Sequence, residues 1–206
     1  MSVENQLADG LHAIGCELSA EQQSRLIDFI SLMNKWSRVY NLTAVRKKVD
    51  MVSRHLLDSL VTLPYLKGSR VLDVGSGAGL PGLPLAIARP DLEFVLIDSS
   101  SKKTRFMLQA VGELALSNVR IEHCRIEDFK PDALFDTVIT RAFADTEKFL
   151  KLAGRMCIKD GQFLLMQGES ASTAVPEGFE LKGKIKLSVP GSISERYLTI
   201  ITPVVL

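Results

Sequence analysis

A glycine-rich segment at residues 71–82 constrains the fold more than any other part of the chain. It reads Val-Leu-Asp-Val-Gly-Ser-Gly-Ala-Gly-Leu-Pro-Gly. The apolar stretch before the glycines predicts a short buried strand, and Pro81 suits the first turn of a helix. Three glycines between them allow a tight turn and a close approach to a ligand: Gly75, Gly77 and Gly79. Units of strand, loop and helix of this kind hold adenosine-containing cofactors in α/β sheets. The segment therefore predicts such a sheet with such a cofactor.

Two cofactor classes fit the glycine pattern. Residues 77–82 match the dinucleotide pattern G-x-G-x-x-G, which is typical of NAD-dependent oxidoreductases. The match begins three residues after the last apolar residue of the strand, however, and Asp73 stands where a pyrophosphate would lie. Its carboxylate would repel phosphate but suits the ammonium group of S-adenosylmethionine. Asp98, which ends a second apolar run, can accept hydrogen bonds from ribose hydroxyls in either case. Charge therefore favours S-adenosylmethionine, and the D-x-G-x-G-x-G pattern resembles motif I of class I methyltransferases.

The spacing of apolar residues divides the chain into a helical and an alternating part. Residues 1–65 have helical spacing, with a capping-box pattern from Ser19 to Gln22 and a later helix that Asp50 can cap. After them, strands are expected at 70–74, 93–98, 119–123, 136–140 and 161–167, and helices at 81–89, 102–116 and 145–157. This alternation predicts a mostly parallel sheet with helices on both faces.

The C-terminal part has a different pattern. Residues 179–189 and 196–204 are two apolar-alternating runs with a turn between them and no helix, which predicts an antiparallel hairpin on the sheet edge. The whole pattern predicts an α/β, Rossmann-like class I methyltransferase fold, with an N-terminal helical extension at 1–65 and a methyltransferase domain at 66–206 in one compact unit. Too few residues remain for the substrate domain of a dehydrogenase.

Composition bounds the class and the compartment of the protein. The 206 residues are 46% hydrophobic and carry a net charge of +1, so a sizeable core is expected. Cys16, Cys124 and Cys157 are too widely spaced for a disulfide framework or a C-x-x-C site. No apolar run has the length of a signal peptide or a membrane span. We therefore expect a cytoplasmic monomer without metal or membrane partners, and we interpret His55 as a hydrogen-bonding or packing residue.

Basic residues gather in one twenty-residue stretch of the helical part. Against the single acid Asp50, it holds Lys35, Arg38, Arg46, Lys47, Lys48 and Arg54. Such a cluster either lies on solvated helix faces or contacts nucleic-acid phosphates. Arg54 has the spacing to pair with Asp58 on a helix. We predict that the six residues bind RNA.

Two further sites follow strands of the predicted sheet. Ile126 and Glu127 follow the third strand, where an adenine ring would lie, and Arg141 follows the fourth, where substrate-facing groups are expected. The chain has neither the Asn/Asp-Pro-Pro-Tyr/Phe motif of adenine aminomethylation nor a cysteine placed to attack a pyrimidine. A nucleophile that needs no deprotonation remains, such as guanine N7, and catalysis then rests on positioning. Arg141 is the candidate for that role, or else it pairs with a cofactor carboxylate or a nearby acid.

Several motifs together resemble one family. They are Lys-Trp-Ser-Arg-Val-Tyr-Asn-Leu-Thr-Ala-Val-Arg at 35–46, Arg-His-Leu-Leu-Asp-Ser-Leu at 54–60, the loop at 73–84, Asp-Ser at 98–99 and Thr-Arg-Ala-Phe-Ala at 140–144. Over residues 20–200 the chain is similar to the ribosomal RNA small-subunit methyltransferase G family, also called glucose-inhibited division protein B. The resemblance implies methylation of N7 of a guanosine in small-subunit (16S) ribosomal RNA with S-adenosylmethionine.

The resemblance also implies cofactor positions at Gly75, Leu80, Ile126, Glu127 and Arg141. The chain departs from the family where relatives often carry Lys-Gly, since it has Gln167-Gly168, and it lacks a basic C-terminal tail. Two alternatives remain besides the oxidoreductase. One is a small-molecule methyltransferase, against which the basic cluster argues. The other is a non-catalytic module that binds S-adenosylmethionine or RNA.

Overall fold

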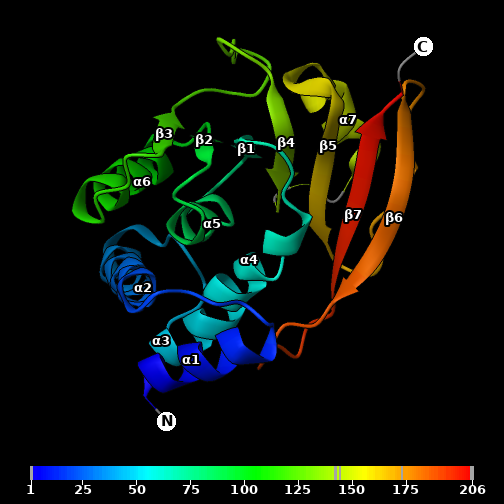
Figure 1. Cartoon of the computed structure of the whole chain (residues 1–206). Coiled ribbons are helices and arrows are strands. Elements are labelled where there is room, and N and C mark those ends of the chain that lie inside the picture. Colours follow the sequence, from blue (N-terminus) through cyan, green and yellow to red (C-terminus); the bar gives the residue numbers. More distant parts are fainter. Residues whose placement is uncertain (1, 142, 144, 173, 205–206) are drawn as a thin grey trace.

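Seven strands form one mixed sheet through the centre of the molecule (Figure 1). The structure is a computed structural model that describes residues 2–141, 143, 145–172 and 174–204. In the order β3-β2-β1-β4-β5-β7-β6, the strands are β3 (Val119–Glu122), β2 (Glu93–Ile97), β1 (Arg70–Val74), β4 (Phe135–Thr140), β5 (Cys157–Gln167), β7 (Arg196–Pro203) and β6 (Phe179–Leu187). β1 to β5 pair in parallel, and β7 is antiparallel to β5 and β6. The predicted sheet with its antiparallel C-terminal hairpin is confirmed.

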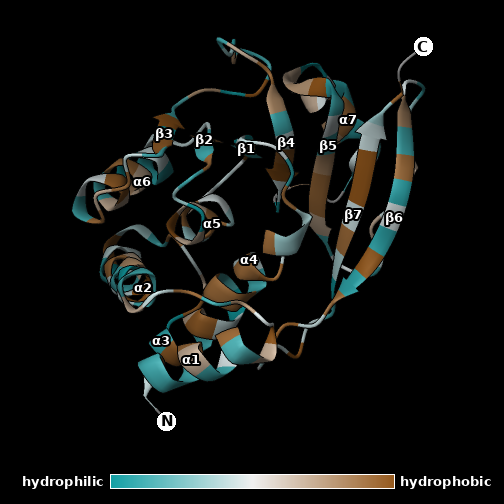
Figure 2. Ribbon diagram, viewed as in Figure 1, coloured by the Kyte–Doolittle hydropathy of each residue, from teal (hydrophilic) through white to brown (hydrophobic). Residues whose placement is uncertain are grey.

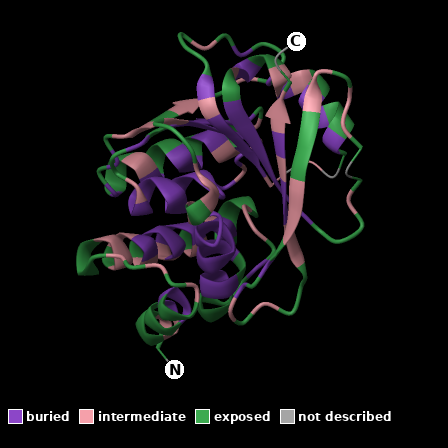
Figure 3. Ribbon diagram, turned by 45° about the vertical axis from the view of Figure 1, so that its right-hand side comes forward, coloured by how far each residue is buried: buried purple, intermediate pink, exposed green. Residues whose placement is uncertain are grey.

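Two apolar cores cover the two faces of the sheet, because strand side chains alternate between faces. On one face, Val71 and Phe94 pack with α5 (Gly82–Ala88) and α6 (Ser101–Glu113). On the other face, Leu72 and Val95 pack with α7 (Thr146–Ala153). Figure 2 shows the brown, apolar sides of the helices turned towards the sheet, and Figure 3 shows buried residues concentrated in the central strands. The edge strand β6 is largely exposed or half-buried.

The N-terminal part is helical, as predicted. It consists of α1 (Val3–Ala13), α2 (Ala20–Tyr40), α3 (Lys48–Met51), the π-helical turn η1 (Val52–Leu57), α4 (Asp58–Leu60) and the 3-10 turn η2 (Leu63–Tyr65). The capping box is present: the Gln22 amide donates to Ser19 Oγ at 3.2 Å and the Ser19 amide donates to Gln22 Oε1 at 2.9 Å. Gln22 Nε2 also donates to the carbonyls of Ile87 and Ala88, both at 3.0 Å, and so caps the end of α5.

The helical extension shares one core with the sheet. Leu26, Phe29 and Ile30 of α2 are fully buried in the same cluster as residues of α5, α6, β1 and β2. Trp36 packs edge-on against Phe106 of α6, with ring centroids 5.7 Å apart. The extension is therefore part of the same hydrophobic core. The division at residues 65 and 66 stays a prediction.

Four local expectations were wrong. Asp50 does not cap a helix, because α3 already begins after Lys47 and its winding widens into the π-helical turn. Pro81 precedes the first helical residue, Gly82, instead of lying in the first turn. The helix predicted at 145–157 ends at Ala153, followed by one 3-10 turn, η3 (Gly154–Met156). β5 begins at Cys157 rather than 161, because Cys157 pairs with Phe135 before the register shifts at a bulge.

Candidate active site

The glycine-rich loop between β1 and α5 has the backbone that its sequence predicts. Gly75, Gly77 and Gly79 all have positive φ angles, of 70°, 61° and 78°, which side chains disfavour. The amides of Gly75 and Ser76 donate to the Ile97 carbonyl at 2.9 and 3.1 Å, which fixes the loop to the end of β2. A Cβ at Gly77 would meet no atom closer than 4.0 Å, so its side of the loop faces open space.

Asp73 lies behind this loop. Its side chain is fully buried, and Oδ2 accepts a hydrogen bond from the Gly82 amide at 2.9 Å. Oδ1 is buried and has no hydrogen-bond partner among the described residues. Burial in apolar surroundings raises the pKa of Asp73 to about 7. The carboxylate thus holds the loop against the start of α5 and has no surface open to the cavities described below, so its predicted contact with a cofactor ammonium stays a prediction.

Asp98 faces the loop from the end of β2. Its Oδ2 accepts from the Gly77 amide and its Oδ1 from the Ser100 amide, both at 2.8 Å. Lys103 of α6 places its ammonium 3.5 Å from Oδ2. Each carboxylate oxygen can accept more than one hydrogen bond, so Asp98 has acceptor capacity left for hydroxyl groups of a ligand. The structure therefore brings Asp98 and the glycine loop together, as the sequence predicted.

A cavity of about 240 Å³ opens beside Asp98. Gly75, Ile126 and Glu127 line it, and Phe143 closes another side. Arg155 lies in the 3-10 turn η3, just before β5. Its Nη2 donates to the carbonyls of Ile126, Glu127 and Phe129 at 2.9, 3.0 and 2.9 Å. This guanidinium fixes the turn after β3 and hence the wall of the cavity. Sequence reasoning missed Arg155, because its three partners lie far from it in the chain.

A second cavity, of about 180 Å³, lies on the other side of the loop. Gly75 lines both cavities, so the two meet across the first glycine. The other walls of this second cavity come from the loop, from α6, from the helical extension and from the end of β4: Leu42, Thr43, His55, Ser76, Gly77, Ala78, Leu80, Lys103 and Arg141. Leu80, a predicted cofactor position, thus lines this second cavity, whereas Gly79 lines neither cavity. A Cβ at Gly79 would lie 2.4 Å from Leu83 Cδ1, so this glycine packs against α5.

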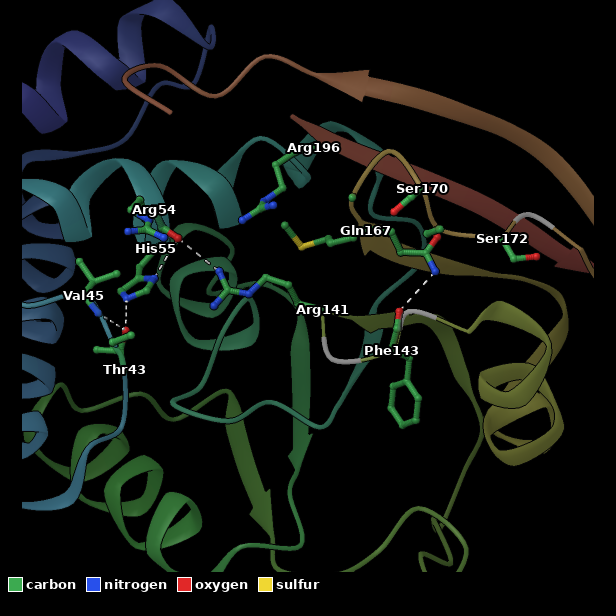
Figure 4. A pocket seen from close by; sticks show the side chains of 14 residues that line it. Thr43, Val45, Arg54, His55, Arg141, Phe143, Gln167, Ser170, Ser172 and Arg196 are labelled. Atoms are coloured by element: carbon green, nitrogen blue, oxygen red, sulfur yellow. Dashed lines mark hydrogen bonds between the residues drawn. The ribbon is translucent and has the colours of Figure 1, made fainter. Parts of the chain in front are cut away.

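A third cavity, of about 530 Å³, adjoins these two (Figure 4). It shares Thr43, His55 and Arg141 with the second cavity and Phe143 with the first. Arg54 and Arg196 add two more guanidinium groups, and no Asp or Glu lines the cavity among the described residues. The rest of the wall combines hydroxyl and amide groups with apolar side chains such as Val45, Phe143 and Met166. A cavity with three arginines and no acid in its wall suits an anionic substrate. Arg141 lies at the boundary between the cavities.

His55 is a hydrogen-bonding residue, as the sequence analysis interpreted it. Its Nδ1 lies 2.9 Å from the Arg54 carbonyl, which only accepts, so Nδ1 carries the proton. Its Nε2 then accepts from the Thr43 hydroxyl at 2.8 Å. Burial lowers the pKa of His55 to about 4, and the positive charge of Arg141 adds to this effect. The ring is therefore neutral near pH 7, and its one lone pair is occupied.

Arg141 pairs with a nearby acid, one of the two roles expected for it. Its Nη1 donates to Asp58 Oδ2 at 2.9 Å, and Arg196 Nε donates to Asp58 Oδ1 at 2.9 Å. The pair of Arg54 with Asp58 that their spacing allows is not formed among the described residues, because the two oxygens of Asp58 accept from Arg141 and Arg196 instead. Ala142 and Ala144 of the motif at 140–144 lie outside the described residues. Gln167, to which no role was assigned, donates to the Phe143 carbonyl at 3.3 Å and accepts from Thr199 Oγ1 at 3.0 Å.

The six predicted RNA-binding residues are all exposed: Lys35, Arg38, Arg46, Lys47, Lys48 and Arg54. Two of them are also structural. Arg46 donates to the Ser37 carbonyl at 3.1 Å and to Asn41 Oδ1 at 2.9 Å, which closes the end of α2. Lys48 Nζ donates to Ser31 Oγ at 2.9 Å. Arg54 also lines the cavity of about 530 Å³, so the basic stretch reaches the candidate active site.

The described ranges contain neither a metal-binding cluster of side chains nor a membrane-spanning helix. His, Cys, Asp and Glu side chains form no group of three or more there that could hold a metal ion. None of the helices in the same ranges combines the length and the apolarity of a membrane span.

Solved structures share the fold of this chain. A SAM-dependent methyltransferase from Aquifex aeolicus superposes with a TM-score of 0.57 at 20% identity, over 72% of this chain and 91% of the other. TYW2 from Pyrococcus horikoshii, solved in complex with MeSAdo, gives a TM-score of 0.56 at 14% identity, over 70% of this chain and 61% of the other. At these identities the likeness concerns the fold alone.

Sequence comparison identifies the family. The family described as rRNA small subunit methyltransferase G matches residues 22–197. A Ribosomal RNA small subunit methyltransferase G from Marinobacter nauticus is 47% identical over 95% of this chain and 93% of its own length. One from Nitrosococcus oceani is 46% identical over 97% of this chain and 95% of its own length. The chain therefore belongs to the rRNA small subunit methyltransferase G family.

Proposed function

We infer that this chain transfers a methyl group from S-adenosylmethionine to N7 of a guanosine in small-subunit ribosomal RNA. The observation that carries the inference is the position of Arg141. Its side chain forms part of the wall of both the second cavity, beside the glycine loop, and the arginine-lined cavity of about 530 Å³. A methyl donor on one side and an acceptor base on the other would meet at this side chain. Membership of the methyltransferase G family supports the same reaction.

The residues around the two smaller cavities fit the cofactor. The open side of Gly77 leaves room for a close approach to the loop, and Lys103 Nζ lies 4.0 Å from where a Cβ would stand. Asp98 can accept hydrogen bonds from ribose hydroxyls. Ile126 offers an apolar wall to an adenine ring, and Glu127 lines the same cavity next to Ile126. The amino-acid portion would extend past Gly75 into the second cavity. When bound, S-adenosylmethionine supplies a methyl group that its sulfonium sulfur makes electrophilic.

No protein base is needed for this reaction. Guanine N7 has a lone pair and no proton, so it could accept the methyl group directly, and the electrons of the broken carbon–sulfur bond would remain on sulfur. His55, which lines the same two cavities as Arg141, is neutral near pH 7 and already accepts from Thr43. The work of the chain is therefore to orient the two reactants and to exclude water. Arg141 is the positioning group that touches both cavities.

The RNA contacts would come from the exposed basic stretch. Arg38 and Lys47 are exposed, and no hydrogen bond or ion pair within the described ranges occupies their charged groups. Arg54 connects this surface to the arginine-lined cavity. We propose that Lys35, Arg38, Lys47 and Arg54 bind backbone phosphates while the target base enters the cavity. Arg46 and Lys48 would contribute less, because they already hold the chain around α2.

One assay tests the proposal against its alternatives. Small ribosomal subunits from cells that lack this activity are incubated with the protein and methyl-labelled S-adenosylmethionine, and the labelled nucleoside is identified after digestion. We expect 7-methylguanosine. Label on a small molecule but not on RNA would indicate a small-molecule methyltransferase. Binding of cofactor and subunits without transfer would indicate a non-catalytic module.

A further inference from the structure

Asp58 joins three segments that are far apart in the chain. It is the first residue of α4, in the helical extension, and its side chain is 2% exposed. Its Oδ2 accepts from Arg141, which follows β4, and its Oδ1 accepts from Arg196, the first residue of β7, each at 2.9 Å. One carboxylate thus bridges two arginines of the candidate active site.

The π-helical turn before Asp58 provides a second contact for the same arginine. Arg141 Nη1 lies 3.4 Å from the Arg54 carbonyl, which also accepts from His55 Nδ1 at 2.9 Å (Figure 4). Turns of this i→i+5 winding are uncommon and often lie at functional sites. Arg141 therefore contacts the helical extension through a carboxylate and through a carbonyl, both from η1 and the residue after it.

This geometry determines where the Arg141 guanidinium lies. Arg141 and Arg196 both line the large cavity, and without a carboxylate between them their like charges would separate. With Asp58 in place, Nη1 of Arg141 is directed at the extension, and the rest of the guanidinium stays in the wall that the two cavities share. Misplacement of a reacting group by about 1 Å can cost about a hundredfold in rate.

We propose that Asp58 is a positioning residue for methyl transfer, which acts by holding the Arg141 guanidinium between the cofactor and the acceptor base. The proposal rests on the proposed function, since it assigns Asp58 a part in that reaction. Asp58 touches neither reactant, because it is buried and lines none of the three cavities. It acts through Arg141, with Arg196 as the second partner that fixes the carboxylate.

A double-mutant cycle tests the proposal. Single-turnover rates of methyl transfer to small subunits, at saturating cofactor and RNA, are measured for wild type, Asp58→Asn, Arg141→Gln and the double variant. We expect Asp58→Asn to lower the rate by about ten- to a hundredfold. In the Arg141→Gln background it should lower the rate less than twofold further, because the group through which it acts is gone. Multiplicative losses in the double variant would overturn the proposal, as would a wild-type rate in Asp58→Asn.

Two further variants separate positioning from stability. Asp136→Asn removes a carboxylate that accepts from the amides of Ser69 and Arg70 at 2.9 and 2.8 Å, at the opposite end of β4 from Arg141. It should lower the melting temperature but leave the rate unchanged. If Asp58→Asn does not fold, Asp58→Glu takes its place, since it keeps the charge and displaces the carboxylate by one methylene. The same non-additivity with Arg141→Gln is then expected.

A spectroscopic measurement keeps this proposal distinct from the proposed function. In wild type, the guanidinium of Arg141 should rotate slowly and give resolved Nη–H resonances in side-chain NMR spectra. In Asp58→Asn those resonances should average, and in Asp136→Asn they should not. If wild type shows held Arg141 resonances but transfers no methyl group, the proposed function fails while the Asp58 contact stands. If Asp58→Asn leaves the resonances unchanged, the positioning role fails.

Discussion

The Asp73 carboxylate accepts a hydrogen bond from the Gly82 amide at 2.9 Å, and this contact closes the glycine-rich loop between β1 and α5. The space around the contact is filled. A Cβ at Gly82 would lie 2.7 Å from Leu96 Cγ and 2.8 Å from Asp73 Oδ2, so only glycine fits there. The loop is therefore held from behind by a buried carboxylate, while its front faces the cavities.

Burial of Asp73 makes stability depend on pH. Its pKa is raised from 3.8 to about 7, so the folded state binds a proton that the unfolded state releases above about pH 4. The stabilisation of the folded state by this bound proton is fully present below pH 4 and is lost as the pH rises to 7. It amounts to about 4 kcal/mol at most, at 1.36 kcal/mol per pKa unit. We expect the difference in unfolding free energy between wild type and Asp73→Asn to fall over this range, measured by urea unfolding at several pH values.

His55 also makes stability depend on pH, but its effect cancels in this comparison. Its pKa is lowered to about 4, so it gives stability that is present above pH 6.5 and lost as the pH falls towards 4, the opposite slope. Because wild type and Asp73→Asn both carry His55, its effect cancels in the difference. A difference that stays constant from pH 4 to 7.5 would mean that Asp73 is ionised throughout.

Gly77→Val should abolish cofactor binding without unfolding the sheet. Gly77 has φ +61° and open space around its Cβ position, so the new side chain would fill the space that a ligand needs. Gly178→Val is the matched control, since Gly178 has φ +86° and nothing within 4 Å but lies outside the cavities. Calorimetric titration with S-adenosylmethionine should show no binding by the first variant and wild-type affinity for the second. Equal affinities would place the cofactor elsewhere.

The local features of the site were predictable from sequence. The positive φ angles of the loop follow from its glycines, and the approach of Asp98 to Gly77 follows from two parallel strands that end at one edge. The capping box at Ser19 follows from residue spacing alone. In each case the interaction is local, or is set by the register of neighbouring strands.

The long-range features were not predictable. The contact of Asp58 with Arg141 and Arg196 depends on how α4 packs against the ends of β4 and β7, which no spacing reveals. The motif at 54–60 drew attention to Asp58 but suggested Arg54, four residues away, as its partner. The depth of Asp73 behind the loop depends on the packing of Gly82 against Leu96, which residue spacing does not reveal either. The early start of β5 depends on a bulge opposite β4.

The exposed basic stretch should set RNA affinity and not cofactor affinity. Replacing Arg38 and Lys47 together with alanine removes two exposed cations, so the slope of log affinity against log salt should fall by about two. Lys151→Ala on α7 is the control. Lys151 is also exposed, but it pairs with Glu147 on the same helix and lies far along the chain from the basic stretch. Filter binding to small subunits at several salt concentrations measures the slopes. Identical slopes for wild type and the double variant would mean that Arg38 and Lys47 are ordinary solvated surface residues that do not contact RNA phosphates.

Arg141 should be the charged residue on which methyl transfer depends most. Arg141→Ala should lower the single-turnover rate by about a hundredfold, the usual effect of losing one well-placed charged group. Arg141→Lys should restore the rate only in part, because lysine lacks the planar fork that reaches Asp58 and the cavities together. Rapid-quench assays with labelled cofactor measure these rates. An alanine variant with a wild-type rate would remove Arg141 from the reaction.

The pH profile of single-turnover methyl transfer to small subunits tests base-free transfer to guanine N7 most directly. The rate should be flat from about pH 6 to 8.5, because N7 does not titrate there and Asp73, whose pKa is about 7, is fully buried and lines none of the three cavities, so it cannot serve as a base. The label should be recovered as 7-methylguanosine. His55 does not interfere, since its pKa of about 4 lies below the range. A bell-shaped profile at constant RNA and cofactor binding, or label on another nucleoside, would contradict the account.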